Sequence, residues 1–162
     1  MPEYLKKNLF INLFIVIIIF SLDRISKFYV IFKSETNLSS SLYTSKFLNI
    51  NLIWNEGIAF GLFSVNKGAF YQLITLLIII IVMILIYLIK RSKNFEKFGF
   101  ILILGGALGN LFDRIFYKAV PDFIDFHINN FHWFIFNVAD IFITTGVFCL
   151  IFVELFYNKK SL

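Results

Sequence analysis

Four long apolar segments constrain this chain more than any other feature of its sequence. A hydrocarbon core about 30 Å thick is crossed by roughly 20 helical residues, and four segments reach about that length. One of them, residues 69–89, contains no charged residue. The expected spans are residues 9–32, 69–89, 98–117 and 134–156. We therefore expect an all-α membrane protein with four transmembrane helices, in which residues 1–162 form a single integral membrane domain.

The composition excludes the main alternatives to a membrane protein. Apolar residues make up 59% of the 162 residues and charged residues 15%, whereas soluble domains have about 45–50% and 25%. The net charge of +5 comes from basic residues that stand between apolar blocks, so it does not form the basic face that binds nucleic acid. The single cysteine, Cys149, cannot form an internal disulfide.

The basic residues beside the spans predict how the chain is oriented. One side of the membrane receives eight of them, Lys6, Lys7, Lys90, Arg91, Lys93, Lys97, Lys159 and Lys160. The other side receives four, Lys33, Lys46, Lys67 and Lys118. Because cytoplasmic loops carry the excess of Lys and Arg, both termini are expected to be cytoplasmic.

The two outer connections are predicted to differ from each other. Residues 33–68 are too many for a bare helical hairpin. Within them Leu48, Ile50, Leu52 and Trp54 stand two residues apart, with Asn49, Asn51 and Asn55 among them, which is the period-2 pattern of a half-buried strand. We expect this connection to form a small β-sheet on the outer membrane surface. The other connection, residues 118–133, is rich in aromatic residues and is expected to be an interfacial segment.

Polar residues from several spans are expected to gather at one depth. At 1.5 Å per residue, Asp23 lies about 21 Å up the first span and Asn110 about 18 Å up the third. Asn137 and Asp140 fall in the first two turns of the fourth span, counted from outside, and Asp122 stands in the adjoining outer loop. A site near the outer leaflet is therefore expected.

Some of these ionisable residues are expected to support the structure, because each costs about 2.5–3.5 kcal/mol inside a span and needs a partner. Asp23 and Lys27, at i and i+4, are predicted to form a structural ion pair. Asn110, Asp113 and Arg114, at i, i+3 and i+4, are predicted to share a helix face, with Asp113 neutralised by Arg114.

Asp122 and Asp140 are the candidates for chemistry. Asp140 has no basic residue within a helical turn, and Asp122 follows Pro121, which fixes the local turn. Two carboxylates close together near hydrocarbon cannot both ionise easily, so one keeps a proton and the pair can activate water against an amide. A proton relay in a small proton-coupled transporter would use similar residues, and a non-enzymatic scaffold is a third reading.

No metal and no cofactor are expected. His127 and His132 match neither an HExxH nor a cysteine-rich spacing, and histidines in loops are usually surface polar groups. Nucleic acid is not expected as a partner either.

The order of five segments resembles a known family. The segments are Asp23-Arg24-Ile25-Ser26-Lys27, Asn55-Glu56-Gly57-Ile58-Ala59-Phe60, Gly105-Gly106-Ala107-Leu108-Gly109-Asn110-Leu111-Phe112-Asp113-Arg114, Pro121-Asp122-Phe123-Ile124-Asp125 and Phe136-Asn137-Val138-Ala139-Asp140. Together they resemble the bacterial lipoprotein signal peptidases, also called signal peptidase II, over the whole chain. The chain departs from the family pattern at Arg24, where Gln is frequent, and at Pro121, where an aliphatic residue is usual.

The resemblance implies an intramembrane aspartic endopeptidase of the bacterial cytoplasmic (inner) membrane. Such an enzyme removes the signal peptide of a prolipoprotein just before the cysteine that carries a diacylglyceryl group. Its implied partners are this lipid-modified substrate and membrane lipids, and it acts as a monomer. The motif matches imply a catalytic dyad of Asp122 and Asp140 and leave the role of Asp125 open. They also imply substrate-binding or dyad-supporting roles for Asn55, Gly106, Asn110, Arg114 and Asn137, and structural roles for Asp23, Lys27 and Asp113.

Overall fold

The computed structural model describes residues 3–36, 41–57, 67–129 and 131–156. Within them lie the helices α1 (Glu3–Thr36), α2 (Lys67–Arg91), α3 (Asn94–Phe116) and α4 (Val138–Phe156). The strands are β1 (Tyr43–Thr44), β2 (Leu48–Asn55), β3 (Val120–Ile128) and β4 (Phe131–Phe136). The predicted bundle of four apolar helices with a small antiparallel sheet is confirmed.

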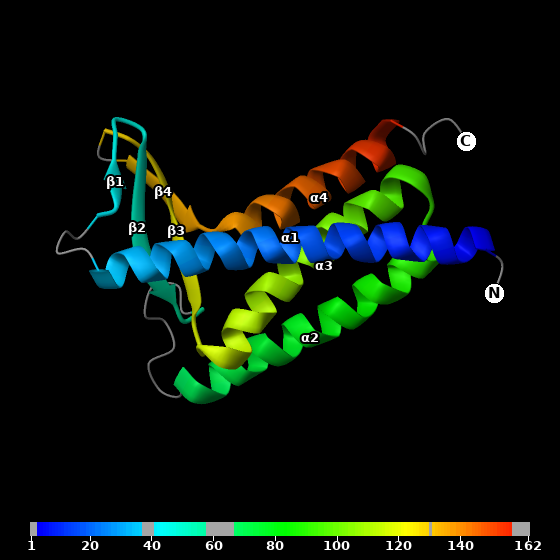
Figure 1. Ribbon diagram of the computed structural model, residues 1–162, viewed down its shortest axis with the longest axis horizontal. Helices are drawn as coiled ribbons and strands as arrows, with labels where there is room; N and C mark the ends of the chain where they lie inside the picture. Colours follow the sequence, from blue (N-terminus) through cyan, green and yellow to red (C-terminus); the bar gives the residue numbers. More distant parts are fainter. Residues whose placement is uncertain (1–2, 37–40, 58–66, 130, 157–162) are drawn as a thin grey trace.

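All four helices are long and apolar enough to cross a membrane, and α3 lies at the centre of the bundle. Half of the apolar stretch of α3 is buried, against 11% in each of the other three. The outward faces of α1, α2 and α4 are therefore left for lipid. The start of α1, the turn between α2 and α3, and the end of α4 lie at one end of the bundle, while the sheet lies at the other (Figure 1).

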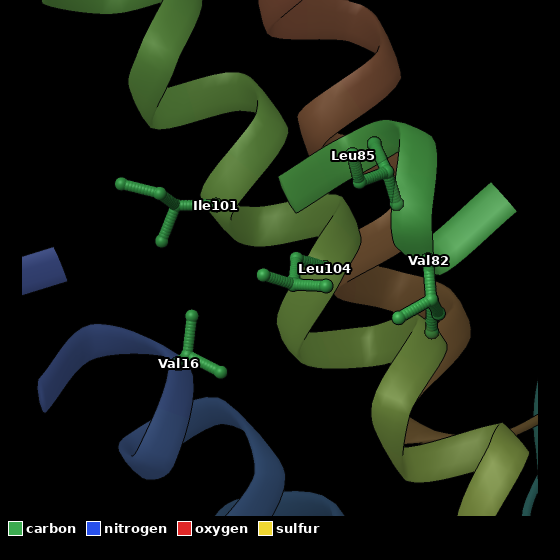
Figure 2. Packing of buried hydrophobic residues seen from close by; sticks show 6 residues of the cluster. Val16, Val82, Leu85, Ile101 and Leu104 are labelled. Atoms are coloured by element: carbon green, nitrogen blue, oxygen red, sulfur yellow. The ribbon is translucent and has the colours of Figure 1, made fainter. Parts of the chain in front are cut away.

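The apolar core lies where α1 and α2 pack against α3 (Figure 2). It consists of Val16 from α1, Val82 and Leu85 from α2, and Ile101, Leu104 and Ala107 from α3. Since lipid tails are as apolar as these side chains, van der Waals packing rather than the hydrophobic effect holds such helices together. Close fit between the helices therefore matters most for stability.

Two glycines of α3 allow the closest helix approaches near the sheet. A Cβ atom on Gly106 would clash with the carbonyl oxygen of Ala139 and lie 2.8 Å from the side chain of Ile143, both in α4. A Cβ atom on Gly109 would lie 2.6 Å from a carboxylate oxygen of Asp23 in α1. These glycines let α3 approach α4 and α1 at the level where the polar residues gather.

A Gly106→Ala substitution is expected to destabilise the bundle by about 1–3 kcal/mol, because the new methyl group meets the backbone of α4, which cannot rotate away. Unfolding in mixed detergent micelles measures the change. Gly68→Ala is the matched control, because a Cβ atom there meets nothing within 4 Å. Equal stability of both variants would contradict the close α3–α4 contact.

Strands from both outer connections form the sheet. Its order is β1-β2-β3-β4 with antiparallel neighbours, and β2 matches the strand expected at residues 48–54. The second outer connection, residues 118–133, is not a bare loop, because most of it forms β3 and β4; its interfacial location stays a prediction. Pairing with β2, which places Ile53 opposite Asp122, satisfies the backbone groups of β3. This pairing joins segments about 70 residues apart, so local sequence does not reveal it.

The fourth span also begins later than residue 134. Strand β4 continues to Phe136 and α4 begins at Val138, so Asn137 is the residue between them. The Asn137 side-chain oxygen accepts the Asp140 backbone N–H at 3.2 Å, and an Asp140 carboxylate oxygen accepts the Asn137 N–H at 3.0 Å. This reciprocal pair is a capping box, and it explains where the helix starts. The first span, expected to end at residue 32, continues to Thr36.

Candidate active site

A buried ionic network surrounds Lys27 in α1. The Lys27 ammonium donates to Asp23 at 3.0 Å, to the side-chain oxygen of Asn110 at 3.0 Å and to Asp113 at 2.6 Å. Arg24 donates to Asp113 at 2.5 and 2.8 Å and to Asp23 at 2.6 Å. Two buried carboxylates thus face two cations, and this balance makes their burial tolerable.

The network confirms one expected ion pair and corrects another. Asp23 and Lys27 pair as predicted. The expected neutralisation of Asp113 by Arg114 is wrong, because Asp113 is paired by Arg24 and Lys27. Adjacent helical residues point about 100° apart, so Arg114 faces α2 instead. Sequence reasoning missed the role of Arg24. A signal was present, because Arg24 stands about one helical turn before Lys27 and two buried carboxylates need two cations.

Asn110 joins this network to Asp140. Its side-chain oxygen accepts from Lys27 and, at 3.2 Å, from the Asn137 side-chain amide. Its own amide nitrogen donates to an Asp140 carboxylate oxygen at 2.8 Å. The orientation of the Asn110 amide is therefore fixed by Lys27, which makes the amide a positioned donor for Asp140.

Asn137 brings Asp122 and Asp140 to one place, as the sequence predicts for residues at a common depth. Its side-chain amide donates to one Asp122 oxygen at 2.6 Å, and its backbone N–H donates to Asp140 at 3.0 Å. Asn55, at the end of β2, donates to the other Asp122 oxygen at 2.8 Å. Asp122 is buried and Asp140 is partly buried. Asn137 thus donates hydrogen bonds to two carboxylates, one from β3 and one from α4.

The surroundings of Asp122 favour its neutral form. Burial raises the pKa of the Asp122 carboxyl above its ordinary value, and the hydrogen bonds from Asn55 and Asn137 oppose this shift. The negative charge of Asp140 adds to the increase, and the charge of Lys27 lowers it. Asp122 therefore holds a proton at a higher pH than an exposed aspartate does.

Arg114 lies apart from this network, on the side of α3 that faces α2. Its guanidinium lies 5.6 Å from the centre of the Tyr71 ring, and its carbonyl oxygen accepts the Tyr71 hydroxyl at 2.8 Å. Two of its guanidinium nitrogens are buried without a hydrogen-bond partner among the described residues. Arg114 also lines a cavity of about 590 Å³ whose polar lining includes Glu56, Gln72 and Lys118. Arg114 therefore adds a positive charge to the lining of this cavity.

The structure accounts for the predicted site residues as follows. It joins Asp23, Lys27, Asn55, Asn110, Asp113, Asp122, Asn137 and Asp140 through hydrogen bonds and ion pairs. It places Gly106 against α4 beside Ala139, and Arg114 at the cavity. Residues 58–60, the end of the motif that begins at Asn55, lie outside the described residues.

Fold and site together define a multi-pass membrane protein with a carboxylate pair held by amides at one end of its helix bundle. Residues 15–156 match the family described as signal peptidase (SPase) II. The chain belongs to the signal peptidase II family.

Curated relatives and solved structures agree with this assignment. A lipoprotein signal peptidase of Pelagibacter ubique (strain HTCC1062) is 53% identical over 155 residues, which cover 96% of this chain and 93% of the relative. One of Anaplasma marginale (strain Florida) is 33% identical, with 96% and 90% covered. A bacterial membrane enzyme solved by the in meso method at 1.9 Å resolution superposes with a TM-score of 0.74 at 32% identity, with 90% of this chain and 93% of that chain covered. A second, solved by the same method at 2.3 Å, gives 0.71 at 30% identity, with 93% and 90% covered.

These similarities confirm the resemblance that the five sequence segments predicted. The family makes this protein a peptidase, and hence a hydrolase, in a multi-pass membrane fold. They give no support to the alternative reading as a small proton-coupled transporter.

Proposed function

We propose that this protein is an intramembrane aspartic endopeptidase with Asp122 and Asp140 as its catalytic dyad, and that it removes signal peptides from diacylglyceryl-modified prolipoproteins just before the modified cysteine. One observation carries the assignment of the dyad. Asn137 donates to both carboxylates, at 2.6 and 3.0 Å, and so holds groups from two different elements at one point. Two carboxylates fixed in this way form the acid and base that water attack on an amide requires.

In the proposed reaction the ionised carboxylate of the dyad takes a proton from water while the water oxygen bonds to the scissile carbonyl carbon. The protonated carboxyl gives its proton to the carbonyl oxygen, which yields a neutral tetrahedral diol. The C–N bond then breaks as the leaving nitrogen receives the proton taken from water, and the hydroxyl proton returns to the other carboxylate. The raised pKa of Asp122 favours Asp122 as the acid and Asp140 as the base.

The remaining site residues have supporting roles in this proposal. Asn55, Asn110 and Asn137 hold the two carboxylates through the hydrogen bonds described above. The guanidinium of Arg114, which lines the cavity, binds backbone carbonyl groups of the substrate there. Gly106 brings α4, and with it Asp140, close to α3. Asp23, Lys27 and Asp113 fix the orientation of Asn110 from behind.

The location of the site fits a substrate that lies across the membrane. A signal peptide places its charged end inside and its apolar stretch across the bilayer, so its cleavage site lies near the outer leaflet. We propose that the whole chain is one integral domain of the bacterial inner membrane with both termini cytoplasmic. The sheet then lies on the outer surface, and the site lies at the level of the outer leaflet. The lipid-bearing substrate reaches it sideways from the surrounding membrane lipids, and the enzyme acts as a monomer.

Cysteine labelling tests this topology. In a Cys149→Ala background, Lys46→Cys between β1 and β2 and Lys93→Cys between α2 and α3 form a matched pair, since both lysines are exposed. In spheroplasts we expect a membrane-impermeant maleimide to label only the variant at residue 46, and both variants after lysis. Labelling at residue 93 in intact spheroplasts would contradict cytoplasmic termini.

The pH–rate profile tests the assignment of Asp122 as the acid. Deprotonation of the acid ends activity, so the rate falls as the pH rises through the apparent pKa of Asp122. The Asn55 amide stabilises the ionised form. Asn55→Ala therefore raises this pKa further and moves the alkaline limb to higher pH, besides lowering the rate about 10-fold through looser positioning. Asn51→Ala, on the same strand, is the control, and we expect it to leave the alkaline limb of the pH–rate profile unchanged. A limb that moves to lower pH, or does not move, would exclude Asp122 as the acid.

A further inference from the structure

A second group of chemically reactive side chains lies on the β3–β4 hairpin, away from the dyad. Asp125 and His127 lie on β3 and His132 on β4, and their ligand atoms all lie within 4.8 Å of one another. His127 and His132 stand opposite each other in the strand pairing, with ring centres 5.1 Å apart. The hairpin thus brings together three potential ligands that show no metal-binding spacing along the sequence.

Among the described residues, one of these side chains is paired with a group that is charged only when protonated, and another has a buried atom without a hydrogen-bond partner. The Asp125 side chain is 4% exposed, and its ion pair is with His132 at 2.9 Å, a cation only when the imidazole is protonated. Asn49 adds one weak hydrogen bond to it at 3.3 Å. The Nδ1 atom of His127 is buried without a hydrogen-bond partner in the described part of the chain. A buried carboxylate without a permanent cation and a buried imidazole nitrogen without a partner both call for a further group.

We propose that Asp125, His127 and His132 bind one Zn²⁺ ion. Two imidazoles and one carboxylate suit borderline transition metals, whereas Ca²⁺ and Mg²⁺ prefer oxygen ligands throughout. Zn²⁺ takes four ligands in a tetrahedron, and water can supply the fourth. Ligands about 2.1 Å from a tetrahedral zinc lie roughly 3.4 Å apart. The half-exposed His132 side chain can rotate to close the remaining gap of about 1.4 Å.

The ion would join β3 and β4 at one end of the hairpin that also carries Asp122. Asp125 is three residues from Asp122, and β4 leads from His132 to Asn137 at the start of α4. The role of the metal is therefore structural, as a clamp on the hairpin. It takes no part in the proposed peptidase chemistry, so the two proposals can fail independently.

A zinc titration tests the site with full-length protein in detergent micelles, purified without a polyhistidine tag and stripped with a chelator. Against a chromophoric zinc chelator we expect one Zn²⁺ per chain with a Kd of about 1 µM or lower, and a rise in Tm on zinc addition. His127→Phe and His132→Phe keep an aromatic ring and remove a ligand, so each is expected to weaken binding at least about 100-fold and abolish the rise in Tm. Trp133→Phe, one residue further along β4, is the matched control with unchanged affinity.

X-ray absorption spectroscopy of the wild-type zinc complex tests the ligands without any variant. We expect the spectrum to show two imidazole nitrogens and oxygen ligands at about 2.0–2.1 Å from the zinc. The proposal is overturned if the wild type binds no zinc at 100 µM, if both histidine variants bind as tightly as the wild type, or if the spectrum shows a sulfur ligand, which would point to Cys149.

Discussion

Replacing Asp140 or Asp122 by Asn is expected to slow cleavage of a diacylglyceryl-modified prolipoprotein at least about 1,000-fold. An amide can neither take the proton from the attacking water nor give one to the carbonyl oxygen, and such proton transfers contribute about 100- to 10,000-fold each. The ratio of kcat/KM between wild type and variant, measured on purified protein in micelles, gives the loss. Either variant cleaving at the wild-type rate would remove that residue from the dyad.

Folding controls make this loss interpretable. Both oxygens of each carboxylate accept N–H groups. In an Asn variant the new NH₂ group therefore faces one of these N–H donors and loses a hydrogen bond. We expect this to lower stability by about 1–3 kcal/mol, which leaves the fold intact in an unfolding assay. Glu96→Gln makes the same chemical change on the exposed first turn of α3 and is expected to leave the rate unchanged.

The double variant Asp122→Asn/Asp140→Asn tests whether the two carboxylates act together as a dyad or contribute to the rate independently. Because groups that act as one unit lose their effect together, the double variant is expected to be no more than a few-fold slower than the slower single variant. Losses that multiply would mean that the two carboxylates act in separate steps or places.

Lys27→Met is expected to have the largest effect on stability. The substitution keeps a long side chain but leaves two fully buried carboxylates, Asp23 and Asp113, with Arg24 as the one remaining cation paired with them in the described part of the chain. Removing one partner of a buried ion pair typically costs about 3–5 kcal/mol. Asn110 also loses the donor that fixes its amide, so cleavage is expected to fall in whatever fraction still folds.

Unfolding in mixed micelles measures this loss, and Lys33→Met in the last turn of the same helix is the matched control. That change is expected to alter stability by no more than about 0.5–1 kcal/mol, as partly exposed charges usually do. If both lysine variants were equally stable, Arg24 alone would neutralise the pair, and the proposed support of Asn110 by Lys27 would be wrong.

Sequence alone reveals the helices and the depth of the site for a physical reason. A bilayer imposes a minimum length on each apolar segment, so the spans are visible without knowledge of their partners. Helical rise then converts residue number into depth, and it placed Asp23, Asn110 and Asp140 at one level. The structure brings these residues into one network.

What sequence reasoning missed depends on contacts between distant segments. Strand β3 is defined by its pairing with β2. The pairing of Asp113 with Arg24 rather than with its neighbour Arg114 depends on where α1 crosses α3. The apolar pattern places Asn137 inside the fourth helix. In the structure it caps α4 and donates hydrogen bonds to both Asp122 and Asp140. The local signal for this cap was present, as an Asn three residues before an acidic residue at the start of an apolar run.

Mass spectrometry of the products of purified enzyme acting on a diacylglyceryl-modified prolipoprotein tests the central claim most directly. Wild-type protein is expected to release an intact signal peptide and a mature chain that begins with the lipid-modified cysteine, and Asp140→Asn is expected to release neither in the same time. The absence of product with folded wild-type protein, or a cut at any other bond, would contradict the proposed activity.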